Sequence, residues 1–145
     1  MYNESRIDIY DYLYNIFYDA VTKNVYSMSE PQELTKSDTT EGFIVITVGD
    51  IVDDSEFDMC AYARARCFIQ AYIPPITRGR LDYEKYKEYE DSINAIIHSA
   101  AADDTSMYHI QEDTVLSYDD TEESNANNLF FMFVKSFVVI IDKKQ

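Results

Sequence analysis

Apolar and polar side chains alternate along residues 60–73, whose sequence is CAYARARCFIQAYI. Small or aliphatic residues occupy one set of alternate positions, and the other set includes Arg64 and Arg66 between aromatic residues. Successive side chains of a β-strand point to opposite faces, so this pattern predicts a strand with one apolar face and one arginine-bearing face. The β-branched residues of 43–52, FIVITVGDIV, predict a preceding strand, with Gly49 as a bulge or an end. Together the two strands predict a β-hairpin.

Helical spacing occurs in two other regions. Apolar residues recur every three or four positions from Ile9 to Val21, which predicts an N-terminal helix. A second such run begins after Asp82, a good N-cap residue, and its charged residues lie on the opposite side. The polar segment before the hairpin contains Pro31 and Gly42, which predicts a loop. The predicted elements are helix 4–26, loop 27–42, hairpin 43–73, helix 82–100 and hairpin 107–142.

The last predicted strand, residues 129–142, is the most apolar segment of the chain. It is apolar at both sets of alternate positions, which predicts that both of its faces are covered, one of them by helices. A chain of 145 residues is long enough to bury a core as one domain, residues 1–145. The predicted fold class is therefore α+β: a small antiparallel or mixed β-sheet, built from two hairpins and packed with two α-helices.

The charge of the chain limits its partners. It has 27 acidic and 12 basic residues, a formal net charge of −15. Such a surface repels nucleic acid, which argues against sequence-specific DNA binding. It is compatible with the wall of a channel through which DNA slides, with imitation of DNA, and with an ordinary solvated acidic surface. Charge alone does not choose among these three.

The sequence contains no motif for catalysis or cofactor binding. The acidic run from Asp50 to Asp58 lacks the spacing of a calcium loop, so we interpret it as a solvated turn, with a weak Mg²⁺ site shared between subunits as the alternative. His98 and His109 lack metal-ligand spacing, and 3 glycines leave no phosphate-binding loop. We therefore predict no enzyme activity, no catalytic residue, no cofactor and no resident metal.

The cysteines and the chain's hydropathy bear on its compartment. Cys60 and Cys67 lie on opposite faces of one predicted strand, so they are predicted to be reduced, buried thiols, as in a cytosolic protein. The N-terminus lacks the features of a signal peptide, and no apolar run approaches the ~20 residues that a membrane helix needs. We expect no membrane partner.

The two arginines of the predicted strand are the clearest indication of function. Buried or half-buried arginines need carboxylate partners. These belong either to the same chain, on a neighbouring strand or the second helix, or to another subunit, because arginine and aromatic residues are enriched at interfaces. The candidate subunit interface consists of Tyr62, Arg64, Arg66 and Phe68.

The order of the predicted elements resembles that of a known family. The segments that carry the resemblance are IYDYLYNIFYDAV, GFIVITVGDIV with MCAYARARCFIQAYIP, YEKYKEYEDSINAII and NLFFMFVKSFVVIID. A helix, a long loop, a β-hairpin, a helix and a closing hairpin are similar to the tail terminator and tail-completion proteins of tailed bacteriophages. Related folds occur in head–tail neck and tail tube proteins. The resemblance spans nearly the whole chain as a pattern of elements, without a signature motif, and it does not account for the acidic segments 28–42 and 119–128.

The resemblance implies a structural virion protein of the tail or neck, assembled in the cytoplasm of a host bacterium. It implies a homo-oligomeric ring, sixfold or twelvefold, that contacts other neck, portal or tail proteins and passes the genome through its lumen. An acidic lumen would keep DNA from sticking. The acidic residues expected in the lumen or between subunits are Asp53, Asp54, Glu56, Asp58, Asp119, Asp120, Glu122 and Glu123.

Two other functions stay open at this point. An acidic inhibitor that mimics DNA needs carboxylates spaced like phosphates over one exposed face, whereas the acids here are spread over several predicted loops. A plain acidic protein-interaction domain needs only a complementary partner.

Overall fold

The computed structural model describes residues 5–29, 31–53, 62–77, 80–103, 107–112 and 130–142. In chain order its elements are α1 (Arg6–Phe17), β1 (Val25–Ser27), α2 (Lys36–Glu41), β2 (Phe43–Asp53), β3 (Tyr62–Ile73), α3 (Tyr83–Ala102), β4 (Tyr108–Glu112) and β5 (Phe131–Asp142). Within these ranges, five strands form one open, mixed sheet in the order β1-β2-β3-β5-β4. The predicted α+β class is confirmed.

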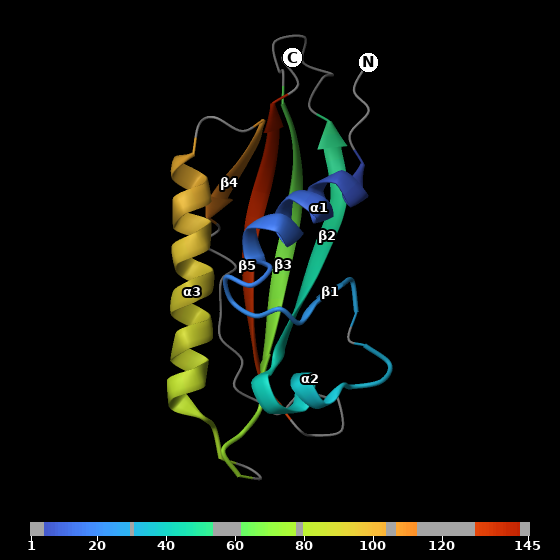
Figure 1. Cartoon of the computed structure of the whole chain (residues 1–145). Helices are drawn as coiled ribbons and strands as arrows, with labels where there is room; N and C mark the ends of the chain where they lie inside the picture. The colour runs from blue at the N-terminus through green and yellow to red at the C-terminus, as the bar shows by residue number, and fades with distance from the viewer. Residues whose placement is uncertain are drawn as a thin grey trace.

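The centre of the sheet is the pair of long strands β3 and β5. They are antiparallel and pair without interruption from Tyr62 opposite Asp142 to Ile73 opposite Phe131. The predicted hairpin partner β2 lies on the other side of β3, and β4 pairs antiparallel with β5. At the edge, β1 runs parallel to β2. Helices α1 and α3 lie on the same side of the sheet (Figure 1).

The main core lies between this helix side and the sheet. From Ala63 to Ile73, every second residue of β3 is buried, as the alternating pattern predicted. The helices contribute Ile9, Leu13 and Phe17 from α1, and Tyr89, Ile93 and Ile97 from α3, at the predicted spacing of three or four. The small alanines of β3 leave room for these larger side chains to pack against the sheet.

A second, smaller cluster covers one end of the opposite face. Its buried members are Phe43, Val45, Tyr72 and Phe130, with Tyr26, Leu34 and Met132 packed against them. The rings of Phe43 and Tyr72 stack with centroids 4.5 Å apart and an interplanar angle of 10°. Because Tyr26 lies in β1 and Leu34 just before α2, the segment that leads into β2 closes this end of the face.

The predicted first helix is too long. α1 ends at Phe17 rather than at residue 26, because Tyr18 has an extended backbone and Asp19 a left-handed one with φ of 62°. Aspartate tolerates this conformation through local hydrogen bonds of its short side chain. The chain then turns into β1, an element that the sequence pattern did not predict, and the Asn24 carbonyl accepts a hydrogen bond from the Ile44 N–H at 3.0 Å.

A short helix interrupts the predicted loop 27–42. α2 begins after Thr35, whose hydroxyl accepts from the Asp38 N–H at 3.1 Å, while the Asp38 carboxylate accepts from the Thr35 N–H at 2.9 Å. The fully buried Asp38 also accepts from the Tyr26 hydroxyl at 2.8 and 2.9 Å. Burial, and next this hydrogen bond, raises the pKa of Tyr26 to about 12, so the hydroxyl stays protonated as a donor. This capping and tertiary contact stabilise a helix too short to predict from periodicity.

The second predicted helix is confirmed as α3, which continues to Ala102. Asp82 is its N-cap, as predicted, and accepts from the Lys85 N–H at 3.1 Å. Within the predicted strand 107–118, β4 is described from Tyr108 to Glu112. The remainder of that prediction and the loop 119–128 lie outside the described residues.

The last strand is confirmed as β5, but its two faces differ. On the helix side Phe133, Phe137 and neighbouring aliphatic residues are buried. On the other side Val138 and Ile140 are only half-buried. The prediction that both faces are covered is therefore confirmed for one end of the strand. At the other end the described chain covers the second face only in part, because the cluster around Phe43 does not extend that far.

Candidate functional site

The candidate site is the part of the sheet surface that faces away from α1 and α3 and lies beyond the Phe43 cluster. We call it the arginine face, and it consists of Val52, Arg64, Arg66, Phe68, Val138 and Ile140. The strand register places Arg64 between Val52 and Ile140, and Arg66 beside Val138. Phe68 lies opposite Ser136 and marks the boundary with the covered end.

Both arginines reach solvent from an apolar surrounding. Arg64 and Arg66 are exposed, whereas Phe68, Val138 and Ile140 are half-buried. Arginine stems pack well on such aliphatic neighbours while the guanidinium groups stay in water. Each arginine also has an interaction within its own chain. The arginine-bearing strand face predicted from the alternating pattern is therefore confirmed. It presents two cations at the surface of a central strand.

A β-bulge around Gly49 decides which side of β2 joins this face. Val48 faces the core, and the register with β3 shifts between Val48 and Ile51. Ile51 packs against the core, so Val52 lies opposite Arg64 and is 51% exposed. The alternation thus changes phase across the bulge, which brings an aliphatic side chain beside Arg64. Of the two alternatives predicted for Gly49, a bulge or the end of the strand, the structure shows the bulge, since β2 continues to Asp53.

Arg6 of α1 binds the strand at this bulge. The Val48 carbonyl accepts hydrogen bonds from Arg6 Nε at 3.0 Å and Nη2 at 2.7 Å. Asp50 lies 4.0 Å from the same guanidinium. A bulge disrupts the strand ladder locally, so a side-chain donor at this carbonyl compensates for lost pairing. α1 is in this way fixed to the strand that borders the arginine face.

Replacing Arg6 with alanine is expected to lower the free energy of unfolding by about 1 to 2 kcal/mol, because it removes two charge-assisted hydrogen bonds from a partly exposed site. Urea unfolding followed by circular dichroism measures this loss. Lys23→Ala, which removes an exposed lysine in the turn after α1, is the matched control and is expected to change stability by less than about 0.5 kcal/mol. Equal effects of the two substitutions would contradict a role for Arg6 at the bulge.

The residues predicted for the site have different outcomes. Arg64, Arg66 and Phe68 share one face, as predicted. Tyr62 lies in β3 and Asp53 in β2, but their side chains lie outside the described part of the structure. The same holds for the other predicted acidic residues: Asp54, Glu56, Asp58, Asp119, Asp120, Glu122 and Glu123. Their place in a lumen or between subunits stays a prediction.

Three members of the arginine face were missed. Val138 and Ile140 were visible as alternate apolar residues of 129–142, but only the register with β3 places them beside the arginines. Val52 is placed there by the bulge. The predicted buried thiol is found at Cys67, where burial raises the pKa to about 12 and keeps the sulfur protonated. Cys60 lies outside the described residues.

The described residues hold no group of three or more His, Cys, Asp or Glu side chains that could bind a metal ion. In the same part of the chain, no helix combines the length and the apolar character needed to cross a membrane. No family model and no curated protein matches the chain. The geometry of the arginine face is therefore the main guide to function.

Proposed function

We propose that this chain is a structural subunit that binds further copies of itself and closes into a ring at the head–tail junction of a tailed-bacteriophage virion. The observation that carries the proposal is the arginine face. It presents Arg64 and Arg66 among aliphatic side chains on a central strand, in a chain whose net charge is −15. Arginine on an apolar surface is typical of a protein interface, and each copy of this acidic chain offers a complementary charge.

Charge also favours a head-to-tail contact. In a two-fold symmetric contact through this face, the arginines of one copy would meet those of the other, and like charges at an interface are unfavourable. A contact between the arginine face and a different, acidic surface avoids that repulsion. Contacts of this kind form rings when the rotation between neighbours closes.

The remaining features fit a ring around a DNA channel. The order of elements resembles that of tail terminator and neck proteins, and a strongly acidic wall lets the genome pass without binding. Other neck, portal or tail proteins would then lie above and below the ring. The two alternatives, a DNA mimic and a plain acidic interaction domain, predict no closed self-assembly.

The test compares the wild type with the double variant Arg64→Glu/Arg66→Glu. Negative-stain electron microscopy at high concentration, with and without Mg²⁺, is expected to show wild-type rings with a central hole. The double variant is expected to remain monomeric with an unchanged far-UV circular dichroism spectrum, because exposed charges on a strand affect association more than folding. Lys23→Glu/Lys36→Glu introduces the same change of net charge at exposed positions outside the face, and it is expected to keep the rings.

Only small single particles of the wild type under every condition would contradict the proposal. Binding of that monomer to a nuclease, with inhibition of DNA cleavage, would favour the DNA mimic instead. Rings that survive in the double variant would show that assembly uses another surface than the arginine face.

A further inference from the structure

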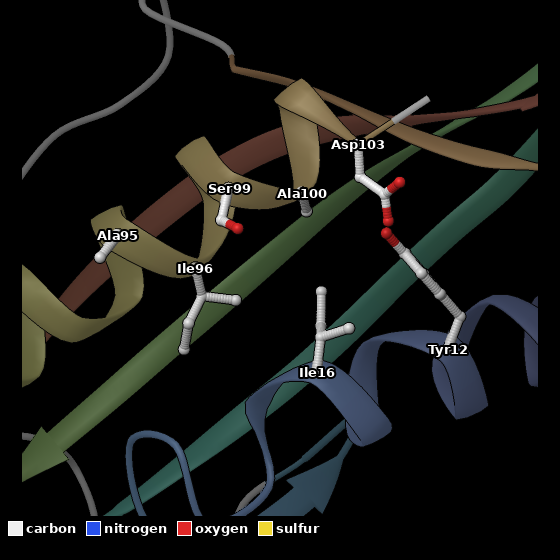
Figure 2. Close-up of a pocket in the computed structure, with 7 residues that line it drawn as sticks. All are labelled: Tyr12, Ile16, Ala95, Ile96, Ser99, Ala100 and Asp103. Carbon is white, nitrogen blue, oxygen red and sulfur yellow. The ribbon is translucent and has the colours of Figure 1, made fainter. Parts of the chain in front are cut away.

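A groove runs between α1 and α3 on the helix side of the molecule. It has a volume of about 510 Å³ and is lined by Tyr12, Ile16, Ala95, Ile96, Ser99, Ala100 and Asp103. Figure 2 shows Ile16 and Ile96 pointing toward one another across it, and the oxygens of Tyr12 and Asp103 facing one another at one end. The groove thus combines an apolar floor with a polar end.

That polar end is negative. Asp103 is the exposed C-cap of α3, and the last turn of this helix contains no basic residue. The carbonyl end of a helix carries a partial negative charge that favours cations. Burial, and next the charge of Asp103, raises the pKa of Tyr12, which keeps its hydroxyl protonated. An apolar floor that leads to an anionic end suits a cation on an apolar stem, which describes an arginine side chain.

The groove and the arginine face lie back to back at the same end of the molecule. Tyr12 stacks on Tyr108 with ring centroids 4.7 Å apart, and Tyr108 pairs with Ile141 in the sheet. The preceding residue, Ile140, points to the opposite side of the sheet and lies beside Arg64. Figure 1 shows this end, where α3 and β5 both finish.

We infer that the groove between α1 and α3 receives Arg64 and Arg66 of a second copy of this chain. The inference rests on the proposed function, for which it supplies the complementary surface. A head-to-tail contact brings the arginine face of one copy over the groove of the next, with a rotation between neighbours that closes the ring. The arginine stems then lie over the isoleucine floor, and a guanidinium reaches Asp103. Asp103 already has an interaction in its own chain, and a carboxylate offers further acceptor positions.

The first test blocks the groove without touching the arginine face. Asp103→Arg reverses the charge at its end, and Ser99→Arg places a long cation in it. Both changes put a basic residue near the C-terminus of a helix, so neither is expected to impair folding. Sedimentation velocity over a range of concentrations is expected to show association weakened at least about tenfold in each variant. Asp91→Arg, an exposed charge reversal on α3 outside the groove, is the control and is expected to stay within about twofold of the wild type.

The second test mixes two defective variants. Asp103→Arg has a blocked groove and an intact arginine face, whereas Arg64→Glu/Arg66→Glu has the opposite defect. Each is expected to be monomeric alone. The mixture is expected to form dimers of one copy each and nothing larger, because only one productive contact is left.

Three outcomes overturn the inference. In the first, Ser99→Arg and Asp103→Arg assemble like the wild type; if the wild-type rings still depend on the arginines, the proposed function stands. In the second, each variant is monomeric but their mixture gives no dimer, so the two surfaces are not partners. In the third, the wild type is monomeric at every concentration, and the proposed function fails together with the inference.

Discussion

Gly42→Ala is expected to lower the free energy of unfolding by about 3 to 5 kcal/mol, one of the largest effects of a single substitution in this chain. Gly42 follows α2 with φ of 90°, a conformation that residues with a Cβ rarely adopt. A Cβ built there would lie 2.5 Å from the Tyr72 carbonyl oxygen and 2.9 Å from the Tyr89 hydroxyl. The first of these atoms belongs to the backbone of the central strand β3, which cannot shift without disturbing its pairing on both sides.

A hydrogen bond beside Gly42 joins α2 to α3. The Tyr89 hydroxyl donates to the Glu41 carbonyl at 2.8 Å, next to Gly42. Burial is the main cause that raises the pKa of Tyr89 to about 12. At neutral pH the hydroxyl therefore stays protonated and remains a donor. A methyl group at residue 42 would press on this hydroxyl and on the strand together. Relieving the strain would therefore require both the Tyr72 backbone and the Tyr89 side chain to move.

Equilibrium urea unfolding of Gly42→Ala and of the wild type measures the effect. Thr39→Ala, an exposed change within α2, is the matched control and is expected to cost less than about 1 kcal/mol. A loss below about 1 kcal/mol for Gly42→Ala would mean that the chain moves easily at this turn, contrary to the close contacts described for it.

The elements that could be predicted are those whose signal is local. The alternation in residues 60–73 placed each described side chain of β3 on its correct face, and Asp82 marked the start of α3. The end of α1 was not predictable, because it depends on the left-handed backbone of Asp19 and on the pairing of β1 with β2. α2 was missed for a similar reason: its stability depends on the contact of Asp38 with Tyr26, 12 residues earlier.

The candidate site likewise has residues that a local pattern predicts and residues that only the tertiary structure places. Two arginines on one strand face are a local pattern, so they were found. Their neighbours Val52 and Ile140 come from other strands, and the bulge after Val48 changes the phase of the alternation before Val52. The groove depends still more on tertiary structure, because it joins side chains of α1 and α3 that are far apart in the sequence, such as Tyr12 and Ile96.

Phe43→Ala is expected to lower the free energy of unfolding by about 3 to 5 kcal/mol, the usual loss for a fully buried phenylalanine. Phe43 has no exposed surface, although it belongs to the smaller cluster on the face of the sheet away from α1 and α3. Besides the stack on Tyr72, its ring meets Tyr26 edge-on at 5.6 Å and Phe130 edge-on at 5.2 Å. These aromatic contacts add to the area that the side chain buries.

The effect of Phe43→Ala distinguishes a true second core from a loose covering of the sheet. Urea unfolding provides the measurement, with Thr47→Ala as control: Thr47 lies four positions further along β2 on the same face and is half-buried, so its loss is expected to cost less than about 1 kcal/mol. Phe43→Leu keeps most of the volume and is expected to lose less than about 1.5 kcal/mol. Similar small losses at Phe43 and Thr47 would contradict the second core. A large loss at Phe43 alone would mean that one end of this face is closed by the chain itself, which confines docking to the end that carries Arg64 and Arg66.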